Sequence, residues 1–183
     1  MQEEHYVPQI MSGELAVRYE RVAKGLAAAI FLGMEADSRM RIIVDAIWAE
    51  FGSHRPVSWV GFYLLGAGEI TLGPRRDKPA CSPIGLHGAC GAVARSGRTL
   101  VVRDVRELGA AYIACDPLDL SEIVVPVRTR DGQVSGVLDM DSYLTDAFGE
   151  IDRCALEKIL SNHLADCAVA DCGCFDALSE RRG

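Results

Sequence analysis

Apolar residues near the start of the chain recur every three or four positions, which is the period of one helix face. They predict two helices, at residues 14–32 and 38–51, with Ser38 as the N-terminal cap of the second and Gly52 as its stop. A further helix is expected to close the chain at residues 146–170. The chain is therefore predicted to begin and end with helices.

Between these helices, branched and aromatic residues gather in short runs separated by turn residues. The runs predict a short helix at 90–95 and strands at 57–65, 70–72, 99–102, 123–127 and 134–140. Ala67-Gly68 and Arg130-Asp131-Gly132 connect neighbouring strands as hairpins, since Asp-Gly is a strong turn signal. This order of elements predicts one α+β domain, a central antiparallel β-sheet flanked by the N- and C-terminal helices.

Two long stretches show neither a helical nor a strand period, at residues 73–91 and 108–121. The first contains four glycines and three prolines. Long ordered loops inside a compact domain are usually functional. Because these stretches carry Cys81, Cys90 and Cys115, we expect the chemistry of the protein to lie on them.

Composition narrows the class of protein further. The 183 residues suffice for one domain, and 49% apolar against 25% charged residues is an ordinary globular composition. A net charge of −7 argues against a nucleic-acid partner, whose phosphates need basic side chains. The longest apolar run, residues 25–34, falls short of the roughly 20 residues of a membrane span. The first residues do not follow a secretory pattern, so we expect no membrane partner and a cytoplasmic location.

Seven cysteines are too few for a secreted disulfide scaffold, and their odd number leaves one unpaired. Three cysteines on two loops suit attack by one thiol and resolution by another. The ordinary alternative for any single cysteine is a small buried apolar side chain. Asp116 follows Cys115 directly, and its negative charge disfavours a thiolate there. Backbone donors or a cation must therefore compensate for Asp116.

Carboxyl groups form a second candidate cluster. Asp139 and Asp141 are two apart on a predicted strand, so they share one face while Leu138 and Met140 take the other. Glu122 begins the strand expected to pair with it. Acids that face one another repel, which raises a pKa and keeps a protonated donor at neutral pH. The alternative is an exposed acidic strand end. No histidine accompanies these acids and no EF-hand spacing is present, so no metal is expected.

Aromatic residues and a terminal group of thiols complete the candidates. Trp59 and Tyr63 are four apart on a strand and share a face, with Phe62 on the other, so they suit a pocket wall or simple core packing. A further candidate group near the C-terminal end consists of His163, Cys167, Cys172 and Cys174. Four ligands would suit zinc, but their spacing matches no common zinc site, so we expect these cysteines to be incidental thiols. Glycine signatures for phosphate binding are absent, and no cofactor is expected.

Seven segments between residues 58 and 141 carry a resemblance to a known family: WVGFY at 59–63, LGP at 72–74, KPAC at 78–81, GACG at 88–91, IACD at 113–116, SEIVVP at 121–126 and GVLDMD at 136–141. They are similar to the free methionine-(R)-sulfoxide reductases, which use a single GAF domain. The resemblance implies one such domain over residues 1–183, with its core at about 14–171 and short flexible tails.

The resemblance also implies a reaction sequence. Cys115 would attack the sulfoxide sulfur, release methionine and become a sulfenic acid. Cys81 resembles the resolving position of the family, and Cys90 is able to share or replace that role. Thioredoxin or a similar dithiol protein would then reduce the disulfide. Trp59 and Tyr63 match the aromatic residues of the family's pocket.

Glu122, Asp139 and Asp141 match the family's acidic cluster around the substrate. A neutral member would donate a proton to the sulfoxide oxygen, and ionised members would hold the ammonium group of free methionine. Two rival functions stay open, a non-catalytic GAF module that binds a small ligand and a thiol redox sensor. The first and last helices also leave a homodimer open.

Overall fold

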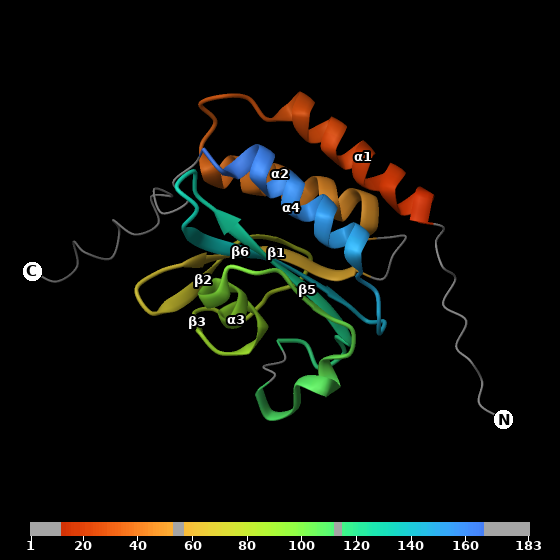
Figure 1. Cartoon of the computed structure of the whole chain (residues 1–183), viewed down its shortest axis with the longest axis vertical. Coiled ribbons are helices and arrows are strands. Elements are labelled where there is room, and N and C mark those ends of the chain that lie inside the picture. Colours follow the sequence, from red (N-terminus) through yellow and green to blue (C-terminus); the bar gives the residue numbers. More distant parts are fainter. Residues whose placement is uncertain (1–11, 53–56, 112–114, 167–183) are drawn as a thin grey trace, which may run out of the picture.

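A sheet with helices on both faces forms the protein (Figure 1). The computed structural model describes residues 12–52, 57–111 and 115–166. The long helices α1 (Ser12–Ala29), α2 (Ala36–Phe51) and α4 (Glu150–Leu164) cover one face, and α3 (Gly88–Ser96) lies on the other. Among the described residues, no helix is both long enough and apolar enough to cross a membrane.

Six strands form the sheet in the order β3-β2-β1-β6-β5-β4, and every neighbouring pair is antiparallel. A 3-10 segment, Val105–Ala111, follows the fourth strand. The predicted α+β class with a central antiparallel sheet is therefore confirmed. The strands are β1 (Val57–Leu65), β2 (Glu69–Arg76), β3 (Ile84–Gly85), β4 (Leu100–Val102), β5 (Ser121–Arg128) and β6 (Val134–Ser142).

Alternation along the central strands divides the sheet into two faces. Phe62 on β1 and Leu138 and Met140 on β6 are almost fully buried and pack with the three long helices. Trp59 and Tyr63 belong to a second apolar cluster, which includes α3. Successive strand residues point to opposite faces, so the helical layer and the opposite face use alternate residues of the same strands.

Several element boundaries differ from the prediction, and the short strand β3 was not predicted. Ser38 lies inside α2 rather than at its cap, because the helix already begins at Ala36. The strand predicted to end at Leu72 continues to Arg76, since Arg75 and Arg76 pair with β1. Pro74 is tolerated there because the register shifts at this point and its missing N–H is not needed.

The last helix begins at Glu150 rather than at residue 146. The backbone N–H of Gly149 donates to Asp152 Oδ2 at 2.9 Å, which fixes the first turn. Arg39 on α2 donates to Asp166 at 2.8 Å and so joins α2 to the segment that follows α4. α4 ends at Leu164 rather than at the predicted residue 170, and the two residues that follow form a turn. Residues 167–170, the tails, and Cys167, Cys172 and Cys174 lie outside the described residues.

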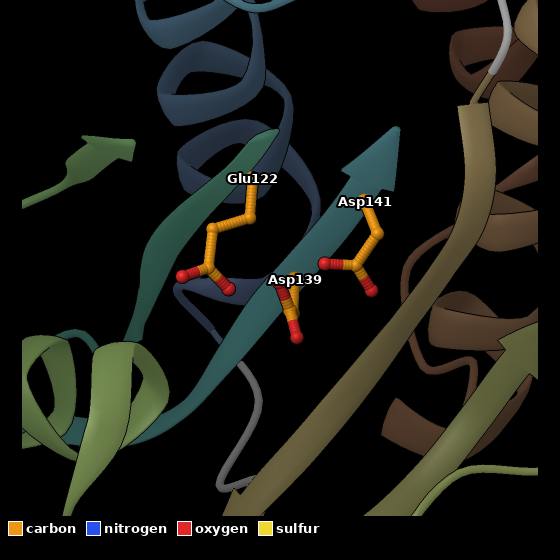
Figure 2. Close-up of side chains that lie close together, drawn as sticks. All are labelled: Glu122, Asp139 and Asp141. Atoms are coloured by element: carbon orange, nitrogen blue, oxygen red, sulfur yellow. The ribbon is translucent and has the colours of Figure 1, made fainter. Parts of the chain in front are cut away.

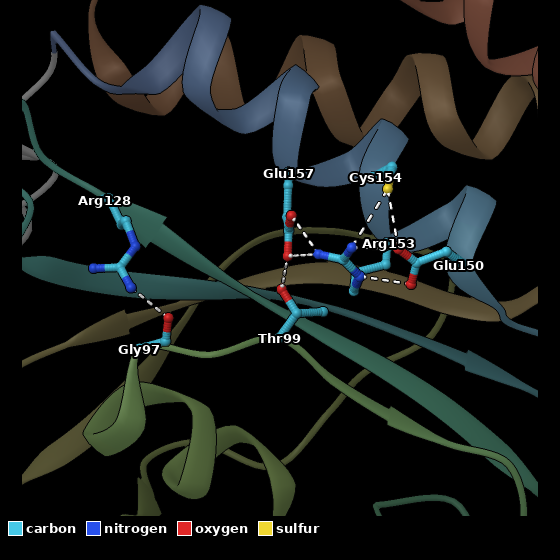
Figure 3. A network of polar contacts seen from close by, with 7 residues as sticks. All are labelled: Gly97, Thr99, Arg128, Glu150, Arg153, Cys154 and Glu157. Atoms are coloured by element: carbon cyan, nitrogen blue, oxygen red, sulfur yellow. Dashed lines mark hydrogen bonds and ion pairs between the residues drawn. The ribbon is translucent and has the colours of Figure 1, made fainter.

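A polar network joins α4 to the edge of the sheet (Figure 3). Arg153 donates to Glu157 at 2.8 Å and to Glu150 at 2.8 Å. Thr99, beside β4, donates its hydroxyl to Glu157 at 2.6 Å. Arg128 on β5 donates to the carbonyl of Gly97 at the end of α3. These contacts join α4, on one face of the sheet, to the segment before β4, and they join the end of α3, on the other face, to β5.

Candidate active site

A cavity of about 150 Å³ opens on the sheet face that α3 covers. Its walls come from β1, β5, β6, the start of α3 and the two long loops. It is smaller than the roughly 300–1,000 Å³ typical of pockets for drug-sized ligands, so it suits a molecule such as a single amino acid. All of the predicted site residues except Cys81 line it: Trp59, Tyr63, Cys90, Cys115, Glu122, Asp139 and Asp141.

One wall is aromatic and depends on a glycine. The rings of Trp59 and Tyr63 lie 5.8 Å apart and are inclined by 33°. The indole covers Gly61, where a Cβ atom would lie only 2.4 Å from Trp59 Cη2. Sequence reasoning did not find Gly61, although a glycine inside a strand between two aromatic residues signals such a close approach.

The polar ends of both aromatic side chains hold the loop that follows β2. Trp59 Nε1 donates to the carbonyl of Lys78 at 3.1 Å, and Tyr63 Oη donates to the carbonyl of Cys81 at 3.1 Å. Arg75 Nε adds a third hydrogen bond, to the carbonyl of Lys78, at 3.2 Å. The backbone that carries Cys81 is therefore anchored to the pocket wall.

Three carboxyl groups that line the cavity lie close together on β5 and β6 (Figure 2) and form its acidic floor. Glu122 on β5 is paired in register with Asp141 on β6, and one oxygen of each of Glu122, Asp139 and Asp141 lies within 4.8 Å of the others. Glu122 and Asp139 are only 5% and 7% exposed. Glu122 Oε1 and Asp139 Oδ1 have no hydrogen-bond partner among the described residues. Two buried polar atoms thus face the cavity ready to bind a ligand.

Burial dominates the acid–base behaviour of this cluster. Burial first, and then the charges of Asp139 and Asp119, raise the pKa of Glu122 to about 8. Burial raises the pKa of Asp139 to about 7, although a hydrogen bond from Cys90 opposes this shift. The pKa of Asp141 is likewise well above its ordinary value, first through burial and then through Asp139. At neutral pH the cluster therefore retains protons and is able to donate hydrogen bonds.

The same three carboxyl groups have the spacing to hold a divalent cation. Cation binding needs ionised carboxylates, whereas burial favours their neutral forms here. Of the group made up of His163 and the terminal thiols, only His163 is described, and it lies on α4, on the opposite face of the sheet. At neutral pH the carboxyl cluster would therefore have to release protons before it could hold a cation.

Two of the three loop cysteines lie together. Burial raises the pKa of Cys115 to about 11, while a hydrogen bond from the backbone of Cys81 lowers it. The Cys115 thiol also contacts the thiol of Cys81 and the hydroxyl of Tyr63. Both Cys81 and Cys115 are exposed and free. The structure thus brings Cys81 to Cys115, although Cys81 does not line the cavity.

Cys90 has a different environment. It lies on α3, is 7% exposed, and its thiol donates to Asp139 Oδ2 at 3.4 Å. Burial first, and then the charge of Asp139, raises the pKa of Cys90 well above its ordinary value. Cys90 therefore remains a neutral thiol against the acidic floor.

Asp119 is a further acid of the cavity that sequence reasoning missed. It lines the cavity and accepts a hydrogen bond from Ser58 Oγ at 2.5 Å. Burial raises its pKa, while Ser58 and the ammonium of Lys78 lower it. No local pattern marks this residue, because its partners come from distant parts of the chain.

Comparison with known proteins identifies the family. The model of the GAF domain matches residues 35–167. The free methionine-R-sulfoxide reductase of Saccharomyces cerevisiae is 39% identical over 107 residues, which cover 56% of this chain and 59% of that protein. The enzyme of the same name from Escherichia coli is 36% identical over 107 residues, covering 57% of this chain and 63% of that protein. The chain thus spans about three-fifths of these curated relatives.

A solved structure matches over a greater share of its length. The free methionine-R-sulfoxide reductase of Neisseria meningitidis, in complex with its substrate, is 32% identical with a TM-score of 0.74. The match covers 85% of this chain and 92% of that one. The chain therefore belongs to the GAF-domain family and, within it, to the free methionine-R-sulfoxide reductases.

Proposed function

We propose that the protein reduces free methionine-(R)-sulfoxide to methionine, with Cys115 as the nucleophile. The observation that carries this proposal is a reachable thiol, Cys115, in one small cavity with three buried carboxyl groups. The names of the relatives supply the substrate class. The cavity volume supports a substrate of the size of one amino acid.

The first half of the reaction is, in net terms, a transfer of oxygen from one sulfur to another. The sulfur of Cys115 attacks the sulfoxide sulfur while a protonated acid of the floor, Glu122 or Asp139, donates to the sulfoxide oxygen. The sulfur–oxygen bond of the substrate breaks and its oxygen leaves as water, which gives an intermediate in which Cys115 is bonded to the methionine sulfur. Water then adds to the Cys115 sulfur, the sulfur–sulfur bond breaks, and methionine leaves with that electron pair. Overall, one thiol and one sulfoxide give one sulfenic acid and one thioether, so the cysteine is oxidised and the substrate is reduced.

The acidic floor also selects the free amino acid. An ionised carboxylate pairs with the substrate ammonium, a group that a methionine residue inside a peptide lacks. Trp59 and Tyr63 provide an apolar wall for the methyl thioether portion of the substrate. Glu122 Oε1 and Asp139 Oδ1, which have no hydrogen-bond partner in the described part of the chain, are available for the polar contacts with the substrate.

Cys81 then resolves the sulfenic acid in our proposal. Its thiol condenses with Cys115–SOH, which forms a disulfide and releases water. Cys81 already contacts Cys115, whereas Cys90 is held against Asp139. A dithiol protein such as thioredoxin regenerates both thiols by exchange, which fits a reducing compartment such as the cytoplasm.

The test measures dithiothreitol-dependent loss of separated R and S epimers of methionine sulfoxide, both free and within a peptide. We expect turnover of the free R epimer alone. Cys115→Ser should abolish it, and Cys81→Ser should release one methionine per enzyme and then recycle slowly. Full activity of Cys115→Ser would refute the assignment of Cys115 as the nucleophile. If no epimer is consumed, the proposed activity is wrong, and the two rival functions remain: a ligand-binding module and a thiol redox sensor.

Cys90→Ser is the matched control for the resolving role. Because Cys90 lies on the floor rather than beside Cys115, this variant should still form the Cys81–Cys115 disulfide, detectable by mass spectrometry after one turnover. Loss of the Cys81–Cys115 disulfide in Cys90→Ser, together with a Cys90–Cys115 disulfide and normal recycling in Cys81→Ser, would assign resolution to Cys90 instead.

A further inference from the structure

A cluster of three side chains lies at the rim of the cavity, beside Cys115. The ammonium of Lys78 pairs with the carboxylate of Asp116, donates to the hydroxyl of Tyr143 at 2.8 Å and lies 4.7 Å from the centre of the Tyr143 ring. Tyr143 in turn donates to Asp116 Oδ2 at 3.2 Å. Each of the three therefore contacts the other two.

These contacts join three distant parts of the chain. Lys78 lies in the loop after β2, Asp116 follows Cys115, and Tyr143 follows the end of β6. Asp116 Oδ1 also accepts a hydrogen bond from the backbone N–H of Leu118 at 2.9 Å, so the same carboxylate shapes the turn after Cys115. The segment that presents the thiol is thus held at the rim by its neighbour in the sequence.

Lys78 is the only lysine or arginine among the described residues that line the cavity. Its ammonium also lies 3.9 Å from Asp119. Burial lowers the pKa of Lys78, but its hydrogen bonds with Asp116 and Tyr143 outweigh burial and raise it, so the ammonium keeps its charge. Pairing with Lys78 in turn lowers the pKa of Asp116, so this carboxylate keeps its charge as well.

We propose that Lys78 is a positioning residue that neutralises the Asp116 carboxylate beside Cys115 and holds the Cys115 segment against Tyr143. This inference rests on the proposed role of Cys115 as the nucleophile. An unpaired carboxylate at position 116 would oppose formation of the thiolate at position 115, because like charges disfavour one another. Lys78 supplies the cation that this pair of neighbouring residues requires.

Other groups that face Cys115 are common to every variant of the test. Tyr63 approaches it from β1, and Cys81 approaches it from the loop after β2. The remaining titratable groups of the cavity are His87, Cys90, Asp119, Glu122, Asp139 and Asp141. Because these groups stay constant, differences between variants at positions 78 and 116 report on the ion pair.

The backbone of Lys78 is held independently of its ammonium, by the hydrogen bonds that its carbonyl accepts from Trp59 and Arg75. Replacing the side chain by one of similar length therefore removes the charge while the loop keeps its anchors. Lys78→Met is the appropriate variant for this purpose, and Lys78→Arg restores a cation.

The test follows alkylation of Cys115 by iodoacetamide between pH 6 and pH 10, read at the Cys115 peptide by mass spectrometry without substrate. Lys78→Met should move the profile to higher pH and slow alkylation at pH 7.5 by roughly three- to tenfold, which corresponds to about half to one pKa unit. Asp116→Asn should not slow it. The double variant should recover to within about twofold of Asp116→Asn, and Lys78→Arg should resemble the wild type.

A double variant as slow as Lys78→Met would overturn the proposal, since Lys78 would then not act through Asp116. An unchanged profile in Lys78→Met would overturn it as well. Circular dichroism of each variant excludes unfolding as the cause of a slower rate. Because the measurement needs no substrate, its failure is distinct from failure of the proposed reductase activity, which the Cys115→Ser turnover assay reports.

Discussion

The buried acids make the stability of the protein depend on pH in a direction opposite to that of ordinary salt-bridged carboxylates. Burial raises the pKa of Glu122 from 4.5 to about 8. Between these values the folded chain holds a proton that the unfolded chain has released, so raising the pH favours unfolding. This contribution to stability is fully present below pH 4.5 and is lost as the pH rises through about 8.

Glu122→Gln removes this proton from both the folded and the unfolded state. Each retained proton changes the free energy of unfolding by about 1.4 kcal/mol per pH unit. Between pH 5 and pH 7 the free energy of unfolding of the wild type should therefore fall by up to about 2.7 kcal/mol more than that of the variant.

The assay is urea denaturation at pH 5, 6 and 7, followed by circular dichroism, with the reduced protein. Val124→Ala is the matched control, because Val124 is fully buried on the same strand but does not titrate. It should lower stability by a similar amount at every pH. Equal slopes in the wild type and Glu122→Gln would refute the assignment of a retained proton to this cluster.

Three further substitutions test the packing. Gly25→Ala, at an exposed position inside α1 with no atom within 4 Å of the added Cβ, should raise the free energy of unfolding by about 0.5–1 kcal/mol; a loss of stability would contradict an open site. Gly61→Ala should displace the indole of Trp59 and raise the KM for methionine sulfoxide, so an unchanged KM and fluorescence spectrum would count against the aromatic wall. Tyr19→Phe should lower the free energy of unfolding, measured by urea denaturation, by about 1–3 kcal/mol, because buried Asp152 loses the hydrogen bond that it accepts from the Tyr19 hydroxyl at 2.8 Å. Unchanged stability would show that this hydrogen bond contributes little.

Strand periodicity predicted the sheet and the acidic floor well. The alternation in β6 placed Leu138 and Met140 against the long helices and left Asp139 and Asp141 on the other face, as the structure shows. The register of β5 and β6 then brought Glu122 to Asp141. Such geometry is local, since a period of two residues fixes which face each side chain takes.

Contacts between distant loops were beyond the reach of the sequence patterns. Asp116 was recognised as a charge that needs a cation, but nothing in the sequence selected Lys78 from the other lysine and arginine residues. The approach of Cys81 to Cys115 depends in the same way on the anchoring of the loop by Trp59 and Tyr63. The roles of these two cysteines were inferred from the resemblance to a family. The extent of the domain core, residues 14–171, remains a prediction.

The division of the sheet into a helical face and a cavity face has a practical consequence. Ser12 of α1 and Asp166 after α4 both belong to the helical layer, whereas the mouth of the cavity lies on the opposite side. A tether attached within this layer would therefore leave the mouth of the cavity open. The division of the sheet suits immobilisation through the helical layer in a device that tests the proposed reductase activity.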